Sequence, residues 1–201
     1  METVALFGAA GFVGRAMTSA LLDAGYAVRA CDLSPLDWTD TAAHGRKRVE
    51  SGLPAPSKHL SLLYGDISDH GVVSRAMDGC IAAVHTTVFF PQAAPGNNSG
   101  THSEEVLAKT WTTNLKGLWN VLDVATANGT HRVVHIGSCT TVYPGSTHHP
   151  PGSLVMTQDV RRPDGSMYAV QKRLQEEMCE CAFIFKHVNY TCSSYARYTR
   201  A

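Results

Sequence analysis

The segment GSMYAVQK places a tyrosine and a lysine one helical turn apart, at Tyr168 and Lys172. Side chains with this spacing share one face of a helix. A lysine ammonium beside a phenol favours the phenolate, which can accept a proton from a substrate, so the pair has the chemistry of an acid/base. A tyrosine and a lysine at the rim of an ordinary helix would show the same spacing. The pair therefore needs support from the rest of the chain.

That support begins with the segment GAAGFVG, in which Gly8, Gly11 and Gly14 stand between an apolar run and a helical pattern. Glycines at such a turn let backbone N–H groups approach a diphosphate, which then meets the positive end of the helix. Asp32 follows about 20 residues on, at the end of the next strand, where a carboxylate can accept both hydroxyls of a ribose. The predicted dinucleotide site comprises Gly8, Gly11, Phe12, Val13, Gly14 and Asp32.

The form of the dinucleotide is predicted from Asp32. Its carboxylate repels the 2′-phosphate of NADP, and the next residues, 33–35, carry no compensating cation. The sequence therefore favours NAD as the cofactor. The alternative is that Arg29, or the basic cluster 46–48, folds back to hold a 2′-phosphate.

The elements that must position these residues alternate between strand and helix. Apolar runs predict strands, and longer amphipathic patterns predict helices. The expected strands are 3–7, 27–31, 59–64, 80–87, 132–137 and 189–195. The expected helices are one after the glycine turn that stops at Gly25, one through 72–79, and the segments 104–128 and 168–185. This alternation predicts an α/β fold, a doubly wound parallel sheet of the Rossmann type with helices on both faces.

Three long connections interrupt the pattern, at 34–58, 91–103 and 144–166. Loops of this length in a compact domain are more often functional than idle. The last two follow the fourth and fifth strands, and the carboxyl edge of an open parallel sheet is where ligands bind. We expect the substrate to be chosen there.

The composition limits the class of partner. A chain of 201 residues with 44% hydrophobic side chains suffices for one domain with one core. Lys plus Arg and Asp plus Glu both total 17, so no net field draws the chain to nucleic acid or anionic lipid. We expect a small-molecule substrate, with no nucleic-acid and no membrane partner.

The cysteines and histidines indicate neither a disulfide framework nor a metal site. The six cysteines are scattered, and several lie in apolar runs where they act as small hydrophobes. The neighbouring His148 and His149 have no third ligand at a suitable spacing. The chain shows no basic region leading into a long apolar stretch. We therefore expect a cytoplasmic protein without a metal.

Several segments stand in an order that is informative as a set: GAAGFVG with its acid at Asp32, then YGDI (64–67), VHTT (84–87), NLKGLWN (114–120), SCTTVY (138–143) and YAVQK (168–172). Together they resemble the extended short-chain dehydrogenase/reductase family, particularly its NAD-dependent epimerase/dehydratase branch. The resemblance covers essentially the whole chain.

For the cofactor, the resemblance implies a second set of contacts beyond the glycine turn. Asp66 and Ile67 would flank the adenine. Thr86 and Thr87 would line the cofactor after the fourth strand, and Asn114 would support its nicotinamide side.

For catalysis, the resemblance implies that Tyr168 transfers the proton, while Lys172 binds the nicotinamide ribose and favours the phenolate. The implied reaction is hydride transfer at a secondary alcohol or ketone carbon of a sugar or nucleotide sugar. A hydroxysteroid-type dehydrogenase or a small-carbonyl reductase is the alternative, and a non-catalytic NAD(P)-binding sensor or assembly subunit is the alternative from another class. Members commonly form homodimers through two helices, here 104–128 and 168–185.

One position departs from the family pattern. The family usually places Ser or Thr where this chain has Cys139, to donate a hydrogen bond to the substrate oxygen. A thiol donates weakly, so either Cys139 makes a weakened catalytic contact, or Ser138, Thr140 or Thr141 replaces it. Alternation along the strand turns Ser138 to the opposite face unless the register slips. A buried, inert Cys139 is the remaining alternative.

The carboxyl end is the second departure. The family continues after the sixth strand into a portion that closes over the substrate, and this sequence stops at Ala201. We therefore expect one NAD-binding domain over residues 1–201, with the C-terminal substrate-binding portion largely absent.

Overall fold

The computed structural model describes residues 1–34, 58–90, 103–130, 132–138, 141, 166–186 and 188–193. Most of the three predicted long loops lie outside these residues. So do the basic cluster 46–48, the pair His148 and His149, and two of the candidate substrate contacts, Cys139 and Thr140.

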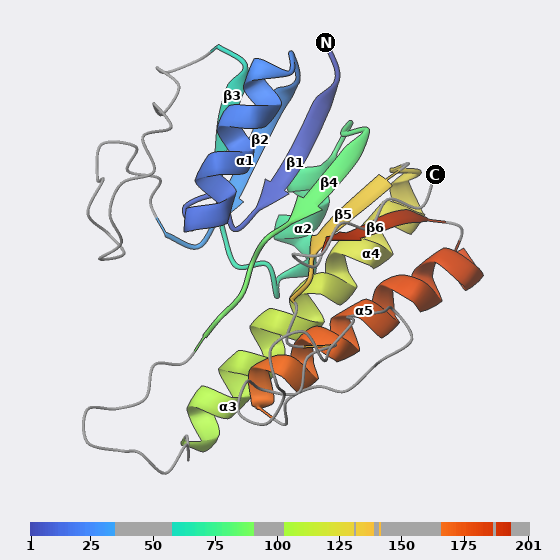
Figure 1. Ribbon diagram of the computed structural model, residues 1–201. Helices are drawn as coiled ribbons and strands as arrows, with labels where there is room; N and C mark the ends of the chain where they lie inside the picture. Colours follow the sequence, from blue (N-terminus) through green and yellow to red (C-terminus); the bar gives the residue numbers. More distant parts are fainter. Residues whose placement is uncertain are drawn as a thin grey trace, which may run out of the picture.

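A six-stranded sheet forms the centre of the molecule, in the order β3-β2-β1-β4-β5-β6, and every neighbouring pair is parallel (Figure 1). The α/β prediction is thus confirmed. The strands are β1 (Thr3–Phe7), β2 (Ala27–Asp32), β3 (Leu60–Tyr64), β4 (Ala82–His85), β5 (Arg132–Ile136) and β6 (Asn189–Ser193).

Strand β4 is shorter than the predicted run 80–87. The backbone N–H of Thr86 still donates to the carbonyl of Phe7 at 2.9 Å. Beyond that bond the chain leaves the sheet, and Thr87 borders a cleft instead. The apolar run therefore predicted the strand but not the place where its carboxyl end turns toward the site.

The helices cover both faces of the sheet, as predicted. They are α1 (Phe12–Asp23), α2 (His70–Met77), α3 (Glu104–Trp111), α4 (Gly117–Asn128) and α5 (Met167–Lys186). Helix α1 packs through its apolar side chains on one face of the sheet, whereas α2, α4 and α5 build the larger core on the other. Strand β1 lies between the two cores, and residues Val4–Phe7 are at most 3% exposed. This double burial explains its continuous apolar sequence.

The predicted helix 104–128 is one helical rod with a widened turn inside it. Between α3 and α4 lies a π-helical segment, η1 (Thr112–Lys116), in which the N–H of Gly117 donates to the carbonyl of Thr112 five residues back. Gly117 also lets the rod approach the sheet, since a Cβ there would lie 2.6 Å from Cγ2 of Ile67. Single π turns often occur at functional sites, and this one contains Asn114.

Among the helices that the structure describes, none has both the length and the apolar character needed to cross a membrane.

Candidate cofactor and active site

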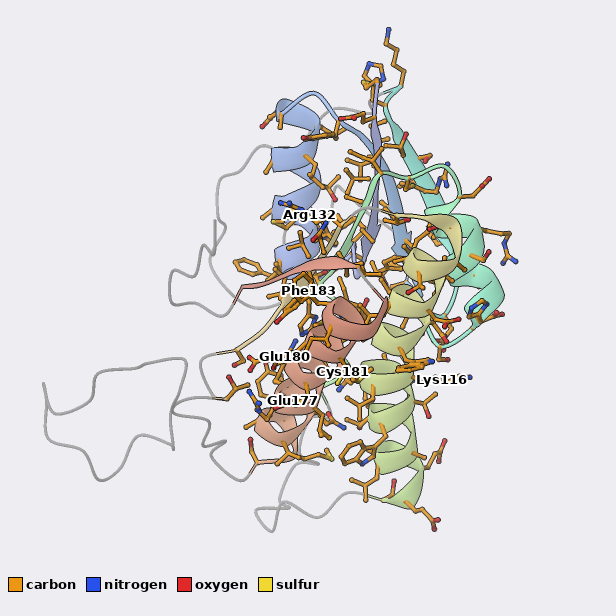
Figure 2. All side chains as sticks on the ribbon, turned by 90° about the vertical axis from the view of Figure 1, so that its right-hand side faces the viewer. Lys116, Arg132, Glu177, Glu180, Cys181 and Phe183 are labelled. Carbon is orange, nitrogen blue, oxygen red and sulfur yellow. The ribbon has the colours of Figure 1, made fainter. Side chains whose placement is uncertain are left out.

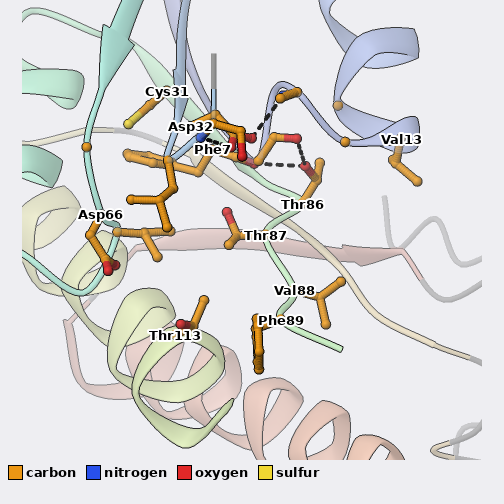
Figure 3. Close-up of a pocket in the computed structure, with 18 of the residues that line it drawn as sticks. Phe7, Val13, Cys31, Asp32, Asp66, Thr86, Thr87, Val88, Phe89 and Thr113 are labelled. Carbon is orange, nitrogen blue, oxygen red and sulfur yellow. Dashed lines mark hydrogen bonds between the residues drawn. The ribbon is translucent and has the colours of Figure 1, made fainter. Parts of the chain in front are cut away.

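A cleft of about 720 Å³ lies at the carboxyl ends of β1 and β4, where the strand order reverses (Figure 3). This reversal is where open α/β sheets bind their ligands. The glycine turn, the end of β2, the segment after β3 and the segment after β4 all border it. The predicted residues that line this cleft are Gly8, Gly11, Phe12, Val13, Gly14, Asp32, Asp66, Ile67, Thr86 and Thr87.

Two of the glycines are required by close approach. Gly8 has a φ of +83°, and a Cβ there would lie 2.6 Å from Oγ1 of Thr86. At Gly14 a Cβ would lie 2.1 Å from the carbonyl oxygen of Gly8. The turn can therefore pass between β4 and α1 only without side chains at these positions.

The first turn of α1 is open toward the cleft. Its N-cap residue, Gly11, has no side chain to accept from the first N–H groups, and no acidic residue lies in that turn. The free N–H groups and the helix dipole therefore favour an anion at this point. The diphosphate of a dinucleotide fits both the bare backbone and the positive end of the helix.

Asp32 connects the end of β2 with the glycine turn. Its Oδ2 accepts from the backbone N–H of Ala10 at 2.9 Å, and its Oδ1 accepts from the N–H of Ser34 at 2.9 Å. Each carboxylate oxygen has a further lone pair for a ribose hydroxyl. Within the described part of the chain, two backbone N–H groups therefore hold the carboxylate in the cleft.

Arg29 does not provide a site for a 2′-phosphate. Its Nη1 lies 3.1 Å from the carbonyl oxygens of Arg75 and Ala76, and 2.7 Å from that of Asp78. The guanidinium therefore binds the carboxyl end of α2. This arrangement leaves the negative charge of Asp32 uncompensated by Arg29.

At the opposite wall, Asp66 and Ile67 are fixed by their own surroundings. Oδ1 of Asp66 accepts from the N–H of Ser68 at 2.8 Å, and the carbonyl of Ile67 accepts from Nδ2 of Asn120 at 2.9 Å. Ile67 is 5% exposed. The pair offers one carboxylate and one apolar side chain, which suits a flat heteroaromatic ring with exocyclic nitrogen.

Cys31 also borders the cleft, and no sequence pattern had indicated it. Burial, and secondarily the charge of Asp32, raise the pKa of its thiol to about 12. The thiol is therefore neutral and unreactive at physiological pH. It serves as an apolar wall.

The two threonines after β4 have different roles. The hydroxyl of Thr86 lies 2.8 Å from the carbonyl oxygen of Phe7 and 3.2 Å from that of Gly8, so it fixes the glycine turn. The side chain of Thr87 projects into the cleft (Figure 3). Of the two, Thr87 is the one available to a ligand.

The acid/base candidates lie beside the cleft rather than in its wall. Tyr168 packs edge-on against Phe90, with 5.4 Å between ring centroids. One turn later on α5, Lys172 is buried and its Nζ donates to the carbonyl of Ile136 at 2.6 Å. The segment Val88–Phe90 thus connects the cleft with Tyr168.

Asn114 organises this connection. Its amide accepts from the N–H of Phe89 at 2.7 Å and donates to the carbonyl of Phe89 at 3.0 Å. The same amide donates to Oε1 of Gln171 at 2.9 Å. Its backbone carbonyl, in the π turn, accepts from Nε2 of Gln175 at 2.7 Å. Asn114 therefore ties the segment after β4 to α5 and does not itself line the cleft.

Among the candidate substrate contacts after β5, Thr141 is engaged within the protein. Its hydroxyl lies 2.9 Å from the carbonyl oxygen of Ser138 and 3.0 Å from Oε1 of Glu176, and the residue is 1% exposed. Thr141 is therefore not placed to contact a substrate. Ser138 is buried, and the contact predicted for Cys139 or Thr140 falls outside the described residues.

Sequence reasoning missed two residues of α3 and η1 that border the cleft, Lys109 and Thr113. They lie four residues apart on one face of the helix, and no motif in the sequence distinguished them. The Lys109 ammonium lies 4.9 Å from the centroid of the Phe89 ring. It adds a cation at the end of the cleft that faces Tyr168.

The outer face of α5 carries Glu177, Glu180, Cys181 and Phe183 (Figure 2). Phe183 is 49% exposed and its neighbour Ile184 is 53% exposed. This face belongs to one of the two helices through which a homodimer was predicted.

A family model described as the NAD dependent epimerase/dehydratase family matches residues 4–195. The chain belongs to this family. Among curated members, it is 29% identical over 186 residues to a bifunctional dihydroflavonol 4-reductase/flavanone 4-reductase of Pyrus communis, covering 88% of this chain and 48% of that protein. It is 32% identical over 142 residues to a 3 beta-hydroxysteroid dehydrogenase/Delta 5-->4-isomerase of Mycobacterium tuberculosis, covering 71% and 33%.

Solved structures share the fold. A short-chain dehydrogenase/reductase superfamily protein of Agrobacterium tumefaciens, solved with bound NAD, superposes with a TM-score of 0.70 at 23% identity, over 95% of this chain and 48% of that one. UDP-glucose 4-epimerase of Brucella ovis, in complex with NAD, gives a TM-score of 0.66 at 21% identity, over 96% and 51%. The chain spans about half the length of the Pyrus communis reductase and of these two structures, and a third of the hydroxysteroid dehydrogenase.

Proposed function

We propose that the protein is an NAD-dependent oxidoreductase that moves a hydride between the nicotinamide and a secondary alcohol or ketone carbon. The observation that carries the proposal is the continuity between the cleft and Tyr168. The wall of the cleft runs from the glycine turn through Thr87 to Phe89, and the next residue, Phe90, packs on the ring of Tyr168. A dinucleotide in this cleft would end beside a phenol.

The described residues suit NAD in particular. The open first turn of α1 would hold the diphosphate, Asp32 would accept from the adenosine ribose, and Asp66 with Ile67 would flank the adenine. A 2′-phosphate would meet the carboxylate of Asp32, which Arg29 does not neutralise. This is the basis for preferring NAD to NADP.

NAD supplies the hydride acceptor. When an alcohol is oxidised, its C–H bond yields the hydride and its O–H bond yields the proton, which the phenolate of Tyr168 accepts as the C=O bond forms. Lys172 would favour that phenolate through its charge and would bind the nicotinamide ribose. Asn114 holds Phe89, and with it the segment that packs on Tyr168, in place.

For the substrate, we propose a multi-ring molecule of largely apolar surface that carries a ketone or a secondary alcohol. Val88 and Phe90 are 42% and 62% exposed, next to Tyr168, so they offer apolar surface at the reacting end. Contiguous exposed apolar surface commonly marks a binding site. The curated relatives are named for a dihydroflavonol and a hydroxysteroid, which are molecules of this class.

A sugar or nucleotide sugar, the class favoured by the sequence, is the second candidate. It follows from the epimerase branch of the family. The 201-residue chain should be offered NAD with steroid and flavonoid alcohols on one side and free and nucleotide-linked sugars on the other, with nicotinamide reduction followed by absorbance. Turnover of sugars alone would contradict the apolar class.

Tyr168→Phe is the matched control for catalysis. It should abolish turnover while NAD affinity, measured by calorimetry, is retained. NAD binding without turnover of any substrate would instead support a sensor or assembly subunit. Cys139→Ser should raise the rate if the thiol is a weakened substrate contact, and an unchanged or lower rate would reject that role.

A further inference from the structure

Two histidines face each other in the core, away from the cleft. His85 ends β4 and His135 lies directly opposite it on β5, and both are 0% exposed. Their Nδ1 atoms are 3.0 Å apart, with 5.1 Å between ring centroids and a tilt of 43°. Across two strands, the imidazoles therefore form a side-chain hydrogen bond.

This geometry fixes the protonation of the two rings. A neutral imidazole carries one N–H and one bare nitrogen, so two Nδ1 atoms can bond only if one is protonated and the other is not. The rings must be opposite tautomers that share a single proton between them. The outer nitrogens, Nε2 of both rings, have no hydrogen-bond partner among the described residues. The shared proton is thus the side-chain hydrogen bond that joins the two rings.

A further proton is opposed by the surroundings. Burial first, and the Lys172 ammonium second, lower the pKa of His85 to about 3. Burial, His85 and Lys172 lower the pKa of His135 as well. At neutral pH roughly one ring in ten thousand would be charged at a pKa of about 3. Burial and Lys172 therefore hold both rings neutral at physiological pH.

The histidine pair lies next to Lys172, whose positive charge the proposed reaction needs. His135 immediately precedes Ile136, whose carbonyl accepts from Nζ of Lys172 at 2.6 Å. From β1, the residue opposite His85 is the apolar Phe7. From α5, the buried polar residues are Lys172 and the neutral Gln171 and Gln175. From β6, the residue opposite His135 is Cys192. After burial, Lys172 is the group that lowers the pKa of both rings.

We propose that His85 and His135 act together as a positioning unit for Lys172. The shared proton joins β4 to β5 at the level where the Ile136 carbonyl holds the ammonium, and it keeps both rings neutral beside that ammonium. A ring without its partner would be left with an unpaired buried nitrogen, which costs more than the loss of an exposed hydrogen bond. The positioning role rests on the function proposed above for Lys172. The shared proton itself does not.

The first test is nitrogen NMR of the histidine rings in the full chain, with signals assigned through His85→Asn and His135→Asn. One ring should be protonated at Nδ1 and the other at Nε2, and both should keep that form from pH 8 to pH 5. Two rings of the same tautomer, or a ring that titrates near its ordinary pKa of 6.5, would overturn the pair. Lys172→Met should let the pair take up a proton at higher pH, and an unchanged titration would overturn the link to Lys172.

The second test compares His135→Asn with His135→Phe. An asparagine amide can reach the position of Nδ1 and keep the bond to His85, whereas phenylalanine fills the volume without it. With both variants folded, His135→Phe should weaken NAD binding about tenfold while His135→Asn stays near the parent value. Equal affinities in the two variants would overturn the positioning role. If the parent chain bound no NAD, the proposed function would be wrong. The NMR result would still test whether His85 and His135 share a proton.

Discussion

Asn114 holds the backbone of Phe89 from both sides, accepting its N–H at 2.7 Å and donating to its carbonyl at 3.0 Å. A side-chain amide thus replaces the neighbouring strand that this segment lacks once it has left the sheet. Asn114 therefore fixes the path of the chain from the cofactor cleft to Tyr168, although Asn114 does not itself line the cleft.

Asn114→Ala should therefore destabilise the protein and loosen that path. It removes both bonds to Phe89 and the bond to Gln171, and leaves buried groups unpaired at a cost of about 2–3 kcal/mol. Asn120→Ala is the matched control, because that buried amide donates to one carbonyl, that of Ile67. Denaturant unfolding should show the larger loss for Asn114→Ala, and equal losses would contradict the clamp.

Gly14→Ala should abolish dinucleotide binding. The new Cβ would lie 2.1 Å from the Gly8 carbonyl oxygen, so the turn must move away from α1. Gly25→Ala is the control: its φ is +86° but nothing lies within 4 Å, so it should cost about 1 kcal/mol of stability and leave NAD affinity unchanged. Calorimetric titration with NAD separates the two, and binding by folded Gly14→Ala would argue against the predicted turn.

Asp32→Asn should reduce the preference for NAD. The change keeps one acceptor oxygen but removes the charge that repels a 2′-phosphate, so NAD affinity should fall about tenfold while NADP loses less or gains. Asp23→Asn, at the end of α1, controls for net charge. An unchanged ratio of NAD to NADP affinity would mean that Asp32 does not set the cofactor.

The free energy of unfolding should fall as the pH drops from 7 to 5. In the folded state the pKa of His85 is about 3 and that of His135 is also lowered, while both rings return to about 6.5 on unfolding. Below that pH the unfolded chain binds more protons, so stability is lost by up to ~1.4 kcal/mol per pH unit per ring. The double variant His85→Asn, His135→Asn should flatten this slope. An equal slope in the parent and the double variant would mean that other groups cause the pH dependence.

Ile184→Glu should shift the protein toward the monomer if it pairs through the helices 104–128 and 168–185, as the family resemblance implies. The side chain is 53% exposed on α5, and a carboxylate there would be buried unpaired in such an interface. Leu62→Glu is the control, on β3 and 42% exposed. Sedimentation at several protein concentrations measures the oligomeric state. A parent chain that stays monomeric at all of them would reject the dimer.

The sequence predicted those features that depend on local patterns. Double burial makes β1 a continuous apolar run and β4 a nearly continuous one. The glycines of the strand-to-helix turn are required by close contacts with the backbone. The parallel direction of the strands and ten residues of the cleft followed from these patterns together with the family resemblance.

What the sequence did not predict depends on contacts between distant segments. The bond between Asn114 and Phe89 spans 25 residues, and that between His85 and His135 spans 50. Arg29 carries the same charge whether it binds a phosphate or the end of α2, and only the fold decides between them. Periodicity contains no information on such choices.

The central claim is that the glycine turn and Asp32 hold a nicotinamide dinucleotide beside Tyr168. Isothermal calorimetry of the folded 201-residue chain with NAD and with NADP tests it most directly. Saturable uptake of one NAD per chain, tighter than that of NADP, is the expected result. A folded chain that takes up neither dinucleotide would contradict the account.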